Sequence, residues 1–166
     1  MAQDKNKSKE YIQYWAEGCS LSPCVASNIA TVSDILHHDY PRLKCDYLND
    51  VYAWDADSYE KNNHKYRNSE TVDMVIGLNF GEMLMVEAKI DVQNVDNIKG
   101  EIEEKICHTK SYLVSSVNYK KNVIPSIVLF GQKNFERLSS RFRRLRSNKT
   151  DIKPMTLPLF YKNYFL

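Results

Sequence analysis

The chain has 166 residues, of which 43% are apolar, 27% charged and 11% aromatic. A single domain of this size, residues 1–166, buries roughly 70% of its unfolded surface. No apolar run approaches the roughly 20 residues of a membrane-spanning helix, and the charged first twenty residues exclude a secretory signal. We therefore expect a cytoplasmic protein without a membrane partner, in which the four cysteines are reduced thiols.

The net charge of +2 conceals an uneven distribution of charge along the chain. Residues 34–104 contain 16 acidic and 7 basic residues, whereas residues 110–149 contain 10 basic residues and one acidic residue. A basic segment of this kind favours a polyanionic partner.

The N-terminal half alternates between helical patterns and one short strand pattern. Apolar spacing predicts a helix over 8–17. A second helix is predicted over 23–38, because Ser22 can cap it and a proline suits its first position. A strand is expected over 47–54, and the polar, aperiodic segment 55–70 is expected to be a long loop.

The centre of the chain has the pattern of a hairpin followed by a helix. Two apolar runs, 71–78 and 83–90, flank a turn that contains Gly81. Apolar residues on one face predict a long helix over 94–117, and the compact apolar run 123–130 predicts a further strand. This order of elements indicates a mixed sheet with helices on its faces, an α/β fold.

Two further elements are expected in the C-terminal part. Residues 133–146 have the spacing of an amphipathic helix with an outward ridge of arginines. The aromatic and apolar tail 155–166 is expected to form a late edge strand.

Three charged residues are clustered on the predicted hairpin. Asp73 lies in the first apolar strand, and Glu87 and Lys89 lie near the end of the second. Charges in apolar strands are costly unless they are paired or bound to a metal. Glu87 and Lys89 also share one face of their strand, because side chains alternate with a period of two.

At this point the chain resembles the PD-(D/E)xK nuclease superfamily. The superfamily pattern is an acid on one strand followed by (D/E)xK on the next strand of a hairpin. Here it reads Val72-Asp73 and then Glu87-Ala88-Lys89. A valine therefore stands where the pattern's name has proline, a replacement that is common in the superfamily.

The resemblance implies a restriction-endonuclease-like core of the order αβββαβ. In this core a mixed central sheet is flanked by helices, and the order predicted above matches it over roughly residues 8–130. This chain would add an extra N-terminal helix and a C-terminal basic helix. The core does not explain the tail beyond residue 150.

The resemblance also implies a metal-dependent nuclease that hydrolyses phosphodiester bonds, with DNA as the expected substrate. Asp73, Glu87 and the carbonyl oxygen of Ala88 would bind Mg²⁺ or Mn²⁺, for which oxygen ligands are suited. Lys89 would orient or deprotonate the attacking water, with its pKa lowered by the nearby metal and other charges.

Further candidate site residues follow from the same resemblance. Some members add a glutamate from the first helix, for which Glu10 and Glu17 are the candidates. His108 and Tyr112 have the spacing of substrate contacts on the long helix of exonuclease-like members, although the usual glutamine is missing. For each of these residues an ordinary surface or packing role is the alternative.

The basic helix is a candidate for binding the phosphate backbone of nucleic acid, with a solvated helix face as the alternative. Its candidate residues are Arg137, Arg141, Arg143, Arg144 and Arg146.

Two other functions stay open for this sequence. The domain could be a catalytically inactive nuclease-fold module that binds nucleic acid or a protein, or the charged triad could be a structural ion-pair network. The sequence does not decide between DNA and RNA, or between endonuclease and exonuclease. It leaves a homodimer open, since small nucleases that cut two strands often dimerise.

Overall fold

The protein is described by a computed structural model. The residues that it describes are 7–17, 26–63, 71–114, 126–145 and 151–166.

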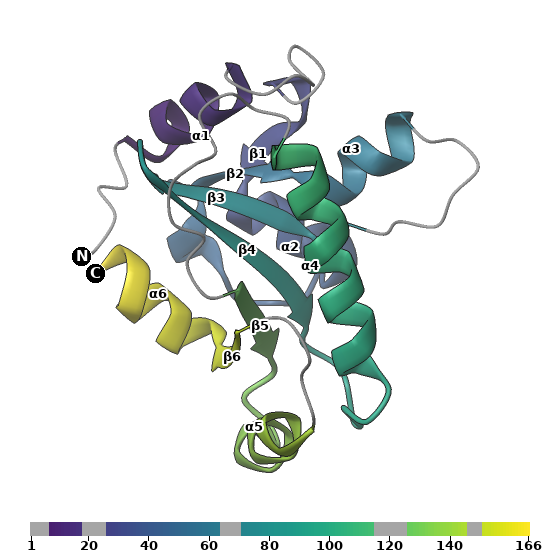
Figure 1. The fold of residues 1–166 in the computed structure, drawn as a ribbon. Helices are drawn as coiled ribbons and strands as arrows, with labels where there is room; N and C mark the ends of the chain where they lie inside the picture. The colour runs from purple at the N-terminus through teal and green to yellow at the C-terminus, as the bar shows by residue number, and fades with distance from the viewer. Residues whose placement is uncertain (1–6, 18–25, 64–70, 115–125, 146–150) are drawn as a thin grey trace.

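A six-stranded mixed sheet organises the fold, with the strands in the order β1-β2-β3-β4-β5-β6 (Figure 1). Strands β1 to β4 pair antiparallel, whereas β4, β5 and β6 run parallel. The strands are Ile29–Thr31, Tyr52–Asp55, Met74–Asn79, Glu82–Lys89, Ser126–Phe130 and Ile152–Thr156. The predicted class, α/β with a mixed sheet flanked by helices, is thus confirmed.

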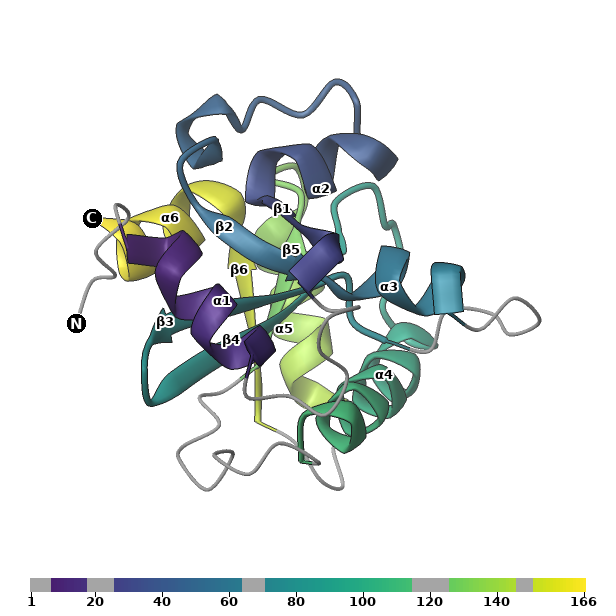
Figure 2. The ribbon, with the colours of Figure 1, turned by 90° about the horizontal axis from the view of Figure 1, so that it is seen from above.

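Helices cover both faces of the sheet, and α4 and α2 lie on opposite sides of it (Figures 1 and 2). Met83 and Met85 of β4 pack into a core with α1, α3, α4 and α5, whereas Leu84 and Val86 pack into a core with α2 and α6. This division follows from the alternation of side chains along a strand. The helices are α1 Ser8–Glu17, α2 Val32–Asp39, α3 Ala56–Asn63, α4 Ile98–Val114, α5 Phe135–Arg144 and α6 Leu157–Phe165.

Several predicted elements form close to their expected positions. Helix α1 has the predicted bounds, and the hairpin of β3 and β4 pairs with Met74 opposite Val86. Helix α4 begins four residues later than predicted, since residues 94–97 form the turn before it. Helix α5 and strand β5 lie within their predicted ranges.

The predicted helix over 23–38 is wrong for the described residues before Val32. Ile29–Thr31 forms β1, which pairs with β2, and α2 begins only at Val32. The cap is Thr31, whose hydroxyl accepts a hydrogen bond from the backbone N–H of Asp34 at 3.1 Å. Pairing with β2 satisfies backbone groups that a helix would otherwise use. The predicted cap Ser22 lies outside the described residues.

Two other expectations need correction. The predicted loop 55–70 contains α3, which begins where Asp55 accepts a hydrogen bond from the backbone N–H of Ser58 at 2.9 Å. The tail forms an edge strand only to Thr156, whose hydroxyl then caps α6. The apolar run after Thr156 is therefore helical.

The described residues also bear on the cysteines and on membrane-spanning helices. Cys45 and Cys107 are free thiols, whereas Cys19 and Cys24 lie outside those residues. None of the described helices combines the length and the apolar character that crossing a membrane requires.

Lys99 connects α4 to the C-terminus of α5. Its Nζ donates hydrogen bonds to the carbonyl oxygens of Phe142 at 3.1 Å and Leu145 at 2.6 Å. A cation at this position is favoured by the partial negative charge of the carbonyl groups at a helix C-terminus.

Replacing this cation should loosen α5. We expect Lys99→Met to lower the free energy of unfolding by about 2 kcal/mol, because two charge-assisted hydrogen bonds are lost. Lys110→Met on the same helix should change it by less than about 0.5 kcal/mol. Urea denaturation of both variants measures the difference, and equal values would contradict the proposed connection.

Candidate functional site

Asp73 and Glu87 meet at one end of the β3–β4 hairpin. The N–H of Ala88 donates to Oδ2 of Asp73 at 2.7 Å, and the N–H of Asp73 donates to Oε2 of Glu87 at 3.2 Å. The sequence suggests that Asp73 lies inside the strand, but in the structure it immediately precedes β3. Each carboxyl group therefore binds the backbone of the other residue's strand end, and the two groups lie together as predicted.

Two lysines bind the buried Glu87, whose side chain is 1% exposed. Its Oε1 accepts from Nζ of Lys89 at 3.0 Å and from Nζ of Lys105 at 2.7 Å. Glu101, one turn before Lys105 on α4, lies 3.1 Å from Nζ of Lys89 and 3.8 Å from Nζ of Lys105. The predicted triad is thus brought together and enlarged by two residues of α4.

Lys105 is absent from the set of site residues predicted from the sequence. The available signal was its spacing, because Glu101, Lys105 and His108 fall on one flank of the predicted long helix. The spacing does not reveal which strand that flank faces. Thr109 positions it, since its hydroxyl accepts from the N–H of Val72 at 2.9 Å and donates to the carbonyl of Lys105 at 2.8 Å.

Burial and neighbouring charges shift the pKa values of both Asp73 and Lys89. Burial, and then the nearby Glu87 carboxylate, raises the pKa of Asp73 to about 7. Burial lowers the pKa of Lys89, but Glu87 outweighs this effect, and the net pKa lies above the ordinary lysine value. Two carboxylates, Glu87 and Glu101, face the ammonium and favour its protonated form. The lowering expected beside a bound metal stays a prediction.

Tyr40 binds the third expected metal ligand. Its hydroxyl donates to the carbonyl oxygen of Ala88 at 3.0 Å. Burial and the nearby Asp73 raise the pKa of Tyr40 to about 12, so the hydroxyl stays protonated. The sequence offers no signal for this contact, because Tyr40 follows α2 and is distant from the hairpin in the chain.

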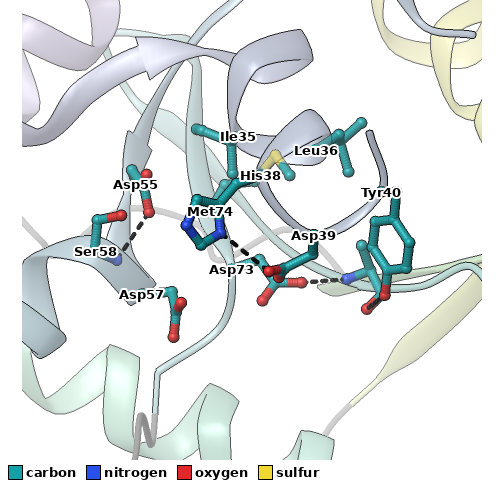
Figure 3. Close-up of a pocket in the computed structure, with 11 residues that line it drawn as sticks. Ile35, Leu36, His38, Asp39, Tyr40, Asp55, Asp57, Ser58, Asp73 and Met74 are labelled. Carbon is teal, nitrogen blue, oxygen red and sulfur yellow. Dashed lines mark hydrogen bonds and ion pairs between the residues drawn. The ribbon is translucent and has the colours of Figure 1, made fainter. Parts of the chain in front are cut away.

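A small pocket beside Asp73 collects further acidic side chains (Figure 3). It is lined by Asp73 together with Asp39 from the end of α2, Asp55 from the end of β2 and Asp57 from the first turn of α3. Asp55 caps α3, and Asp57 pairs with Lys61. These carboxylates make the surroundings of Asp73 negative and already serve local structure.

Glu10 is not brought to this site. Helix α1 contacts the hairpin at its opposite end, where the indole N–H of Trp15 donates to the carbonyl of Asn79 at 3.2 Å. Asn79 is six residues from Asp73, or about 20 Å of extended strand. Glu10 itself is exposed. The side chain of the other candidate, Glu17, lies outside the described residues.

The two expected substrate contacts on α4 have different outcomes. His108 lies near α3, with Nε2 4.0 Å from Oε1 of Glu60. It stands one turn after Lys105 and so borders the site. The side chain of Tyr112 is outside the described residues.

The arginines of α5 face the loop that follows β4. Arg137 donates to the carbonyl of Gln93 at 3.2 Å, and Nε of Arg141 binds Asp96 at 2.7 Å. An open groove of about 480 Å³ lies there, which we call the arginine groove. Its lining includes Gln93, Asn94, Val95, Asp96, Arg137, Arg141 and Arg144.

The other two candidate arginines do not line the arginine groove among the described residues. Arg143 is exposed on α5, and Arg146 lies outside the described residues. The loop begins directly after Lys89, which ends β4. The loop that lines the arginine groove therefore follows the strand that carries Glu87 and Lys89.

The oxygen atoms at the hairpin end are suited to a hard divalent cation. Asp73 and Glu87 supply carboxylates and Ala88 supplies a carbonyl, and Mg²⁺ is commonly held by one or two carboxylates together with water. The ammonium groups on Oε1 of Glu87 occupy a position that a cation would take. Among the described residues, no cluster of three or more His, Cys, Asp or Glu side chains is arranged to hold a metal.

Neither a protein-family model nor a curated protein nor a solved structure matches the chain.

The Asp73 pKa predicts an unusual pH dependence of stability. A carboxyl group with a raised folded-state pKa favours the fold at low pH, and this contribution is lost as the pH rises from about 4 to about 7. Asp73→Asn removes the ionisation, and its amide oxygen can still accept from Ala88. The free energy of unfolding of this variant, relative to that of wild type, should therefore rise by about 2 kcal/mol between pH 5 and pH 8 in EDTA.

Urea unfolding at the two pH values measures this gain. Asp91→Asn, at an exposed carboxylate in the loop after β4, is the control and should show the same difference from wild type at both pH values. A difference for Asp73→Asn that is likewise independent of pH would contradict the raised pKa.

Proposed function

We propose that the protein is a metal-dependent nuclease of the PD-(D/E)xK type that hydrolyses phosphodiester bonds, with DNA as the first substrate to test. One observation carries the proposal. The reciprocal hydrogen bonds of Asp73 with Glu87 and Ala88 gather two carboxylates and a carbonyl at one strand end. Lys89 binds the Glu87 carboxylate from the same strand, so all members of the motif lie close to one another.

The arrangement of elements supports a restriction-endonuclease-like core. Helix α2 precedes the antiparallel strands β2, β3 and β4, and α4 then leads to β5, which is parallel to β4. Apart from α3, which is inserted between β2 and β3, this order is αβββαβ. Its helices α2 and α4 lie on opposite faces of the sheet. In this proposal α1 is the extra N-terminal helix and α5 the C-terminal basic helix.

The residues of this chain would divide the chemistry as follows. Asp73, Glu87 and the Ala88 carbonyl would hold Mg²⁺ or Mn²⁺, which when bound acidifies a water and neutralises phosphate charge. Lys89 would stay protonated, as its raised pKa favours, and would orient the water or donate to a phosphate oxygen. Deprotonation of the water by Lys89 is the less favoured role.

The arginine groove is the proposed path of the nucleic-acid backbone. Arg137 and Arg141 bind the loop after β4, and this loop begins directly after Lys89. Arg144 lines the same groove from the last turn of α5 and is exposed. A phosphate backbone in this groove would be led toward the hairpin end.

A second candidate function is a catalytically inactive module of the same fold that binds nucleic acid or a protein partner. The favouring observation is the charge balance of Glu87, whose buried carboxylate is already compensated by Lys89 and Lys105. An ion-pair network of this kind is stable without a metal.

Cleavage assays distinguish the two functions. We expect the wild-type protein to cut DNA with Mg²⁺ or Mn²⁺, and Glu87→Gln and Lys89→Ala to reduce the rate at least about 100-fold, because a metal ligand and a cationic donor are lost. Glu104→Gln, at an exposed glutamate of α4, should retain the wild-type rate. Full activity in both site variants would contradict the proposed catalytic centre, and binding without cleavage by wild type would favour the inactive module.

The groove has its own test in a binding measurement. Arg144→Ala should weaken binding of duplex DNA and lower the slope of log affinity against log salt by about one, because one phosphate contact is lost. Fluorescence anisotropy in EDTA measures this without cleavage. Lys162→Ala on the exposed side of α6 is the matched control. Equal effects of the two substitutions would contradict a backbone path in the groove.

A further inference from the structure

Lys105 makes the shorter of the two contacts to the Glu87 carboxylate. Its Nζ lies 2.7 Å from Oε1, compared with 3.0 Å for Lys89, and its side chain is 14% exposed. Glu87 is buried, and a buried carboxylate without a compensating charge destabilises a fold. Lys105 therefore supplies positive charge at the place where the proposed function requires a divalent cation.

A bound cation would compete with this ammonium. Mg²⁺ binds oxygen ligands at about 2.1 Å and keeps some of its water molecules. With two lysines on the same carboxylate oxygen, a third cation meets strong like-charge repulsion. Either the metal binds weakly or an ammonium leaves Oε1.

Glu101 offers a second acceptor one helical turn away. Its Oε1 lies 3.8 Å from Nζ of Lys105, and its side chain is 51% exposed. The backbone of α4 is fixed nearby by Thr109, which bonds both Val72 and Lys105. A change of side-chain rotamer thus suffices to move the ammonium from Glu87 to Glu101.

We propose that Lys105 is a positioning residue that holds the place of the divalent cation at Glu87 and shifts to Glu101 when the metal binds. This inference rests on the proposed function, since it concerns the same metal site. In the metal-free protein Lys105 keeps the two carboxyl groups assembled. The same contact sets the metal affinity, because the cation must displace the ammonium.

The test is a calorimetric titration of Mn²⁺ alone into the full chain. Lys105→Met should bind Mn²⁺ about tenfold more tightly than wild type, because the competing charge is removed. Lys105→Arg keeps the charge and should stay within about threefold of wild type. Lys110→Met, on the same helix, is the control and should leave the affinity unchanged.

Thermal unfolding provides a second readout that separates this role from packing. In EDTA, Lys105→Met should melt at a lower temperature than wild type, and saturating Mn²⁺ should raise its melting temperature by more than it raises that of wild type. If Lys105 only packs, the substitution should lower the melting temperature in EDTA and in saturating Mn²⁺ by the same amount. If Lys105→Met does not fold, Lys105→Gln replaces it in both measurements.

The role of Glu101 is tested by a double-mutant cycle. Glu101→Gln should weaken Mn²⁺ binding in the wild-type background, and this effect should shrink in the Lys105→Met background. Additive effects would overturn the transfer to Glu101.

The results separate this inference from the function on which it rests. If wild type binds Mn²⁺ and Lys105→Met binds it equally or more weakly, the place-holding role is overturned while the metal centre stands. If wild type binds no Mn²⁺, the proposed metal centre fails, and the inference fails with it.

Discussion

The reciprocal hydrogen bonds between Asp73 and the end of β4 are the contact on which the site depends. They link the residue before β3 to Glu87 and Ala88 and fix the register of the hairpin at that end. A shift of one residue would turn Glu87 to the opposite face, where α2 packs, and would separate it from Lys89 and Lys105. The contacts of Lys89 and Lys105 with Glu87 therefore depend on this register.

Helix α4 connects this pair to the rest of the molecule. Thr109 binds it to Val72 beside Asp73, and Lys105 binds it to Glu87. At its other end Lys99 holds the last turn of α5, which carries the arginines. One helix therefore compensates the buried charge and also positions the basic surface proposed to bind the substrate.

The part of the site that could be predicted from the sequence depends on short-range patterns. Two apolar runs around Gly81 predict the hairpin, and strand periodicity then places Asp73, Glu87 and Lys89 at one end of it. The contacts of Tyr40 and Lys105 could not be predicted, because they depend on how α2 and α4 pack on the sheet.

The elements that were predicted wrongly from the sequence have identifiable physical causes. The polar sequence of α3 has little apolar periodicity, and its start depends on capping by Asp55. The apolar run after Thr156 fits a strand or a buried helix equally well by periodicity, and the Thr156 cap with Pro158 in the first turn decides for the helix. The short strand β1 is stabilised by pairing with β2, a partner that lies about 20 residues away in the chain.

The most direct test of the metal centre is a crystal structure of the protein with Mn²⁺, with the metal located by its anomalous scattering. We predict a peak within about 2.3 Å of oxygen atoms from Asp73, Glu87 and the Ala88 carbonyl. A well-ordered hairpin end without such a peak at saturating Mn²⁺, with Lys89 and Lys105 both still on Glu87, would contradict the metal centre.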